Sequence, residues 1–169
     1  MTAVGQVKRA VAAAIKAAGC AAIESYSEEQ LKRYATAVAA VGTKETVIEE
    51  SGAAQYLGEK VDEATQETVS VYGRKMLLTL LIEVDAPRTL GAMGCEKAAE
   101  AVTQALMTAL PEGLKLGSLQ WGKTGWDKTT GMFRLDASAK YAAYFVAEAA
   151  EDETVFTDFI LKGTVKERE

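Results

Sequence analysis

A glycine- and lysine-containing stretch, Gly117–Thr124, has residue types at a spacing that could bind a nucleotide. It satisfies the expression G-x-x-x-x-G-K-[ST], in which backbone amides surround phosphates, Lys123 would reach the outer phosphates and the Thr124 hydroxyl would meet magnesium. A working loop of this kind follows a buried strand and opens a helix. Here Leu119 and Trp121 indicate a strand that runs through the motif, and the residues after Thr124 predict a turn. We therefore interpret the stretch as a hairpin rich in glycine and lysine, and keep a small nucleotide-dependent enzyme as an alternative.

Two further groups of residues have side chains that could react. Gly91–Cys95 opens a predicted helix, whose free amides could hold an anion and would lower the pKa of the Cys95 thiol. Ordinary capping of the helix is the simpler interpretation. Four carboxylates share one acidic turn: Glu148, Glu151, Asp152 and Glu153. The sequence places no pair of them in a cleft, so we interpret them as a solvated face and not as the acid and base of a glycosidase.

Absent residue types exclude most hydrolytic chemistry. The chain has no histidine, so it cannot contain a Ser-His-Asp or Cys-His arrangement or a zinc site built on imidazole. Two cysteines, Cys20 and Cys95, are too few for an all-thiolate metal site. They fit free, buried thiols in a reducing compartment better than a disulfide framework. We predict a protein that is not an enzyme, with no catalytic residue, no cofactor and no metal.

Composition predicts one domain over residues 1–169. A chain of 169 residues can bury a substantial core but is short for two domains. Its net charge of -5 argues against a general nucleic-acid binder, although a local basic patch would be compatible with it. No apolar run reaches the roughly 18 residues that span a bilayer, and no signal-peptide pattern is present, so we expect a cytoplasmic start and no membrane partner.

Residues 69–86 form the one long stretch that reads as strand from end to end. Alternation puts five apolar residues on one face: Met76, Leu78, Leu80, Ile82 and Val84. The other face is mixed, which predicts a central strand with one side in a core. Pro87 should end the strand, and Gly91 and Gly94 should then allow a helix to begin.

The remaining elements follow from apolar periodicity. Helical spacing predicts helices over 4–18, with Gly19 as a cap, and over 93–110. Alternating or continuous apolar runs predict strands over 34–48, 114–121, 132–147 and 155–163. Residues 20–34 are an uncertain connector with a possible short strand and helix start, and 164–169 should be a frayed, charged tail. The predicted fold class is α+β, a mainly antiparallel sheet with helices packed on one face.

Residues 51–68 have weak periodicity, two glycines and many charges. They predict an extended arm or long loop, which in a compact domain is uncommon and usually functional or mobile. A solvated hairpin tip that lengthens two strands is the equally favoured alternative.

Four short motifs and a helix, in the order given below, resemble the tail terminator proteins of tailed phages and prophages. The motifs are framework residues spread over most of the chain: Tyr56-Leu57-Gly58, Val71-Tyr72-Gly73-Arg74-Lys75 opening the long strand, a helix, a glycine-rich turn into Met132-Phe133-Arg134-Leu135, and Phe156-Thr157-Asp158-Phe159-Ile160-Leu161-Lys162-Gly163. The resemblance brings no catalytic signature.

The resemblance implies a structural subunit of the virion tail. Such a subunit closes into a homohexameric ring, caps the tail tube, stops its polymerisation and presents a surface to the head-tail connector protein. Its partners would be copies of itself, the tail tube protein, possibly the sheath, and the connector, with DNA only as cargo passing through the ring. It would be assembled in the cytoplasm of the host bacterium. A different phage neck or baseplate protein with the same α+β plan is the alternative within this class.

Overall fold

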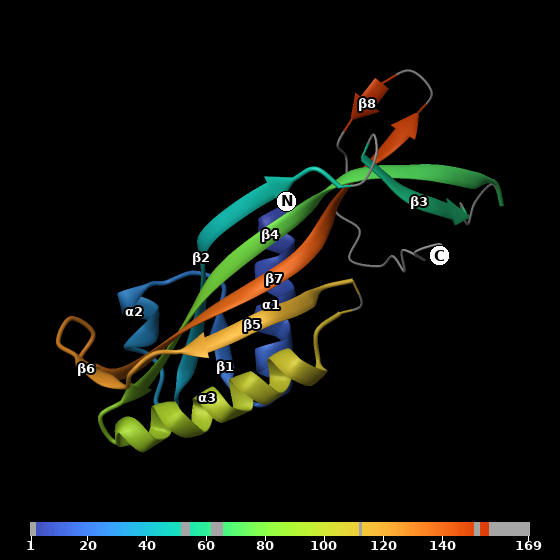
Figure 1. The fold of residues 1–169 in the computed structure, drawn as a ribbon. Coiled ribbons are helices and arrows are strands. Elements are labelled where there is room, and N and C mark those ends of the chain that lie inside the picture. Colours follow the sequence, from blue (N-terminus) through green and yellow to red (C-terminus); the bar gives the residue numbers. More distant parts are fainter. Residues whose placement is uncertain (1–2, 52–54, 62–65, 112, 151–152, 156–169) are drawn as a thin grey trace.

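One twisted, mostly antiparallel sheet forms the centre of the protein, and two long helices cover one of its faces (Figure 1). The computed structural model describes residues 3–51, 55–61, 66–111, 113–150 and 153–155. Its elements in chain order are α1 (Ala3–Ala17), β1 (Ala21–Ile23), α2 (Glu28–Leu31), β2 (Val38–Glu49), β3 (Tyr56–Val61), β4 (Thr68–Pro87), α3 (Gly91–Thr108), β5 (Lys115–Trp121), β6 (Gly125–Asp127), β7 (Met132–Ala150) and β8 (Glu153–Val155). The predicted α+β class is confirmed.

The long strand β4 lies at the middle of the sheet, as predicted for residues 69–86. The strand order is β1-β2-β4-β7-β5, and β4 pairs with β7 from Val71 opposite Glu148 to Pro87 opposite Met132. The alternate residues from Met76 to Val84 are almost completely buried. Pro87, which has no backbone N–H, is the last residue of β4.

Both predicted long helices pack on this apolar face. Val7, Val11 and Ile15 of α1 have no exposed surface, and α1 contacts both β2 and α3. Buried residues of α3 face β4 and β7, and the helix runs two residues earlier at each end than the predicted 93–110. Gly19, two residues beyond the end of α1, has φ +83°, so it takes the left-handed conformation expected of a cap. Each fully buried aliphatic side chain here contributes roughly 1.5–3 kcal/mol.

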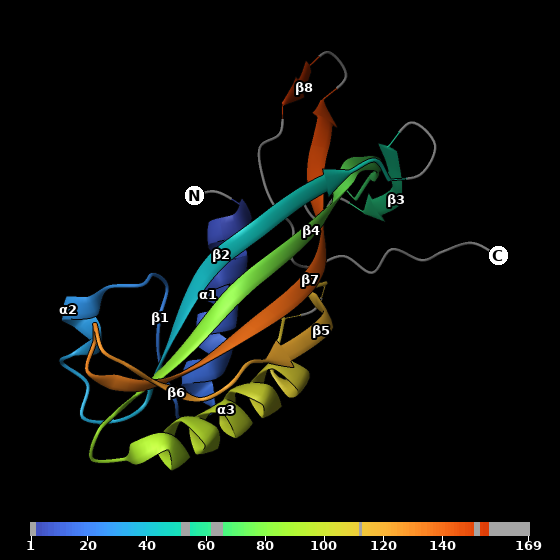
Figure 2. The same ribbon diagram turned by 60° about the vertical axis from the view of Figure 1, so that its left-hand side comes forward.

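The connector 20–34 contains both short elements that its sequence suggested. Residues 21–23 form β1, which pairs in parallel with β2, whereas every other strand pair among the described residues is antiparallel. Ser27 caps α2, because its hydroxyl oxygen accepts a hydrogen bond from the Gln30 N–H at 3.4 Å. Leu31 of α2 packs in a small second core with Val38 and Met132. Figure 2 shows α2 apart from α1 and α3.

Within 51–68, the residues that the structure describes do not form an unstructured loop. Residues 56–61 form β3, which pairs with the start of β4 from Tyr56 opposite Tyr72 to Val61 opposite Thr68. The alternative of a hairpin that lengthens the sheet is therefore correct, because Tyr56, Leu57 and Val61 supply enough β-forming residues among the charges. We call Thr43–Glu49 of β2, β3 and Thr68–Lys75 of β4 the distal sheet; it extends beyond the two long helices (Figure 2).

Strand β2, which corresponds to the strand predicted over residues 34–48, begins in the core and leaves it. Its first four residues are buried, and Thr43–Glu49 are exposed. A bulge lies between Thr43 and Glu45, where the register with β4 shifts.

At the C-terminal side, β7 is three residues longer than the predicted 132–147. The strand expected over 155–163 lies outside the described residues except for Val155, and so does the tail 164–169.

Candidate functional site

Residues 117–124 do not form a phosphate-binding loop. Gly117–Trp121 lie inside β5, as Leu119 and Trp121 predicted, and the Gly122 N–H donates to the Asp136 carbonyl at 2.7 Å. Thr124 is followed by β6 and not by a helix. The motif therefore lies largely within a strand, and no helix N-terminus follows Lys123 where phosphates would have to bind.

The Cys95 thiol is buried and not activated. Its side chain has no exposed surface, and its Sγ donates to the Phe133 carbonyl oxygen at 3.0 Å. Burial raises the pKa of Cys95 to about 11, which is opposite to the lowered pKa that a helix N-terminus suggested. The reason is that tertiary packing against β4 and β7 removes the thiol from water. Cys20 is also buried and free, as predicted.

The acidic residues near the C-terminus do not share one turn. Glu148 lies in β7, paired with Val71 on one side and Val155 on the other, and Glu153 begins β8. Glu151 and Asp152 lie outside the described residues. Residue patterning alone could not show that the strand continues to Ala150, because its pairing partner, the start of β4, is distant in sequence.

An ionic cluster centred on Arg134 was not predicted. Its Nε donates to Asp85 Oδ1 at 2.9 Å, its Nη2 donates to the Tyr26 hydroxyl at 2.6 Å, and its Nη1 lies 3.3 Å from Asp127 Oδ2. The guanidinium also lies 4.9 Å from the centre of the Tyr26 ring. Alternation placed Arg134 on the polar face of its strand, but only the register, with Arg134 opposite Asp85, brings the charges together.

The interactions of this cluster hold parts of the fold together. Asp85 is fully buried, and burial raises its pKa even though the hydrogen bond from Arg134 and the charge of Arg134 act in the opposite direction. Asp127 accepts hydrogen bonds from Thr129 N–H and the Thr130 hydroxyl, which lower its pKa. Tyr26 is thereby held over β7, which ties the 20–34 connector to the sheet.

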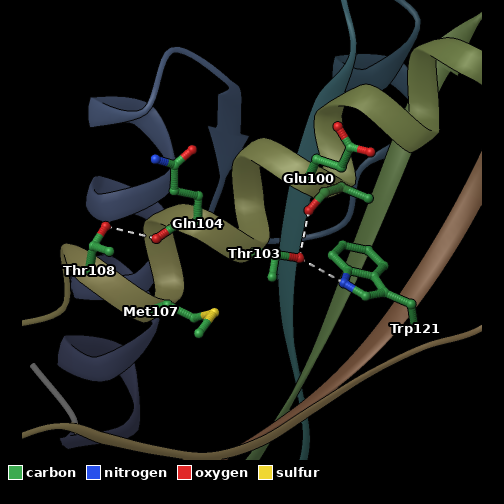
Figure 3. Close-up of a pocket in the computed structure, with 7 residues that line it drawn as sticks. Glu100, Thr103, Gln104, Met107, Thr108 and Trp121 are labelled. Atoms are coloured by element: carbon green, nitrogen blue, oxygen red, sulfur yellow. Dashed lines mark hydrogen bonds between the residues drawn. The ribbon is translucent and has the colours of Figure 1, made fainter.

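A groove of about 420 Å³ lies between α3 and β5 (Figure 3). Seven residues line it: Ala99, Glu100, Thr103, Gln104, Met107, Thr108 and Trp121. Both threonine hydroxyls in it are engaged, since Thr103 accepts from the Trp121 indole N–H at 3.0 Å and Thr108 donates to the Gln104 carbonyl at 2.8 Å. Met107 is 73% exposed. A largely apolar, open groove of this kind suits a protein side chain better than a small polar substrate.

Several exposed large apolar residues lie in the distal sheet. Val47 and Ile48 are successive in β2, so they project from opposite faces, and they are 40% and 50% exposed. Val61 of β3 is 57% exposed, and Tyr56 packs edge-on against Tyr72 at 5.7 Å between ring centres. Because β1 pairs only with Val38–Ala40, the rest of the outer edge of β2 faces no strand in the described part of the chain.

Comparison with known proteins assigns no family. No family model matches the chain, and no curated protein is significantly similar to it. Within the described residues, His, Cys, Asp and Glu form no group that could hold a metal ion, and no helix has the length and apolarity needed to cross a membrane. The geometry therefore offers surfaces and strand edges as the functional features to explain.

Proposed function

We propose that this protein is a tail terminator subunit of a phage or prophage. In this role it forms a homohexameric ring that caps the tail tube, stops tube polymerisation and contacts the head-tail connector. The motifs around Tyr56, Val71 and Met132 that resemble this family support the proposal, and they fall on β3, β4 and β7 of the sheet. The protein then belongs to the virion tail and is assembled in the host cytoplasm.

The observation that carries the proposal is a pair of unlike, open sheet edges. One edge is β2 from Val41 to Glu49, which has exposed Val47 and Ile48; the other is the outer side of β5 beside the apolar groove. Closed rings require heterologous contacts between two different surfaces of the same subunit. A sheet with two dissimilar edges on opposite sides provides such surfaces, and exposed strand edges are available for pairing.

A second support is the uncovered apolar surface of the distal sheet. Soluble monomers rarely expose clustered large apolar residues, and such clusters mark protein interfaces. Val47, Ile48 and Val61 are exposed large apolar residues spread along the distal sheet, with Ile48 opposite Met76 and Val61 opposite Thr68 on β4. In the proposed ring, this end meets the neighbouring subunit or the tube.

The test is the length of tubes assembled from purified tail tube protein. Adding the wild-type protein should shorten and cap the tubes, whereas Ile48→Lys, which puts a charge on the β2 edge, should not. Ala13→Lys on the exposed side of α1 is the matched control and should cap as well as wild type. Unchanged tube lengths with the wild-type protein would sink the proposal.

A further inference from the structure

The open edges of β2 and β5 have the same length and lie on opposite sides of β4 and β7 (Figure 1). β1 covers the outer edge of β2 only at Val38–Ala40, which leaves Thr43–Glu49 uncovered by any strand among the described residues. β5 has seven residues, and Thr43–Glu49 has the same number. The outer edge of β5 likewise faces no strand in the part of the chain that the structure describes. The two edges could therefore cover each other completely if they came from two copies of the chain.

The edge of β2 has acidic residues on one face and an apolar residue on the other. Glu49 lies opposite Lys75 of β4, next to the buried Met76, so Glu49 projects from the face that the long helices leave uncovered. Glu45 projects from the same face. Ile48 lies opposite Met76 and projects from the other face, with 50% of its surface exposed.

The edge of β5 has the opposite charge on the corresponding face. Lys115 is exposed and lies opposite Ala142 of β7, next to the buried Tyr141, so Lys115 also projects from the face without the long helices. The exposed Lys140 of β7 projects from this face as well. Leu116 lies opposite Tyr141 and projects from the helix-covered face, where it packs against the core.

We propose that β2 of one copy of this chain pairs with β5 of the next copy in an antiparallel ladder that sets Glu49 opposite Lys115. Neither residue forms an ion pair among the described residues. The same alignment places Ile48 opposite Leu116 on the helix-covered side. Opposite charges and apolar side chains that lie directly across an antiparallel pair both stabilise the pairing.

The internal geometry of the sheet supports this direction and register. Successive neighbours in the order β2-β4-β7-β5 are antiparallel, so β2 and β5 of one subunit run in opposite directions. They remain opposite in copies related by rotation about an axis along the strands. Beyond the bulge between Leu116 and Ser118, the alignment brings Gln120 opposite Glu45, and both project from the same face. The two faces therefore stay matched along the contact.

This inference deepens the proposed function and rests on it, since it names the contact that joins neighbouring subunits of the ring. The contact is heterologous, because it uses a different strand from each copy. Each subunit on its own keeps one open β2 edge and one open β5 edge, and only a closed ring pairs them all.

The first test is a disulfide between two separately made full-length chains. Mixing a Glu49→Cys chain with a Lys115→Cys chain brings two thiols directly opposite each other, whereas Ile48→Cys mixed with Lys115→Cys places them on opposite faces. Mild oxidation of concentrated protein should join the first mixture in at least about tenfold greater yield than the second, since a disulfide needs Cβ atoms that face each other. Tryptic peptide mass spectrometry identifies the link, and native Cys20 and Cys95 are buried.

Charge reversal gives an independent measurement on the same pair. Glu49→Lys and Lys115→Glu each set like charges opposite one another, so each should weaken self-association of the full chain by roughly two- to tenfold in sedimentation experiments. A chain that carries both substitutions restores an opposite-charge pair and should associate as wild type does. Recovery in the double variant also shows that neither substitution acts through misfolding.

Four outcomes would overturn the inference: no disulfide in the first mixture, equal yields in both mixtures, no loss of association in the single variants, or no recovery in the double variant. The proposed function fails on a different measurement, the length of tubes with the wild-type protein. Tubes that are capped normally while the Glu49–Lys115 disulfide is absent would leave that function standing and place the subunit contact elsewhere.

Discussion

At the scale of single residues, Asp85 stands out because it is a fully buried carboxylate that pairs with a charged partner, Arg134. Its side chain is fully buried, and Arg134 contacts only one of its two carboxylate oxygens; the other has no hydrogen-bond partner among the described residues. A carboxylate with one unsatisfied buried oxygen carries a desolvation cost. The raised pKa of Asp85 expresses that cost.

Replacing Asp85 by Asn should change how stability depends on pH. Because the folded-state pKa of Asp85 is raised, its carboxyl contributes most below its ordinary pKa of 3.8, and this contribution is lost as pH rises through the raised value. Asn does not titrate, so the stability of Asp85→Asn relative to wild type should improve as pH increases from about 4 and then level off above the raised pKa.

Urea unfolding at a series of pH values measures this difference for Asp85→Asn. Glu49→Gln is the control, since this exposed carboxylate is not among the groups that act on Asp85, and substitution at such a position changes stability by no more than about 0.5 kcal/mol. A relative stability that falls with rising pH would contradict the assigned direction.

At Gly94, close packing leaves no room for a side chain. A Cβ at this position would lie 2.6 Å from Leu90 Cβ and 3.3 Å from Ala86 Cβ. Gly94→Ala should therefore force the start of α3 away from the end of β4 and destabilise the fold by about 1–3 kcal/mol. Gly125→Ala, whose added Cβ would have no atom within 4 Å, is the matched control. Thermal unfolding of both variants checks the prediction, and equal midpoints would refute it.

At the scale of elements, α3 has one side in the core and another beside the groove. Leu106 is 1% exposed and Met107, its neighbour, is 73% exposed. Leu106→Ala should cost about 2–5 kcal/mol because it leaves a cavity between α3 and the sheet. Met107→Ala should change the free energy of unfolding by no more than about 0.5 kcal/mol. Chemical denaturation measures both, and a large loss in Met107→Ala would show that the groove is covered in the free protein.

At the scale of the whole molecule, a helix-covered body carries a sheet that extends beyond it (Figures 1 and 2). The body has its own core and needs no partner to bury it, whereas the distal sheet exposes apolar residues on both faces. This division suits a subunit that folds first and assembles later, with the assembly contacts concentrated at one end and at the sheet edges.

The proposed ring predicts six subunits on each capped tube. Mass measurement of capped tube ends, by native mass spectrometry or by counting a labelled subunit, should give six copies for the wild-type protein. Ile48→Lys should be absent from the tube ends while keeping the unfolding midpoint of wild type, because its side chain is exposed. A reproducible count other than six, with capping intact, would exclude the hexamer.

The sequence by itself determined the elements whose signal is local. Alternation at Met76–Val84 and helical spacing at Val7, Val11 and Ile15 predict which faces are buried, and the structure confirms both. The same local evidence was enough to reject the phosphate loop, because Leu119 and Trp121 already read as strand. Patterns of this kind depend on residues within one or two turns or pleats of each other.

Features that depend on how the strands pair could be seen only in the tertiary structure. The contact between Arg134 and Asp85 joins residues 49 positions apart, and β3 is held by pairing with β4. The Cys95 thiol is buried and donates to the Phe133 carbonyl oxygen, and this burial raises its pKa. None of these has a local signature, because a shift of one residue in strand pairing would turn every side chain to the other face without changing the sequence pattern. The open edges on which the proposed assembly rests are likewise a property of strand order, which forms only when distant segments pair.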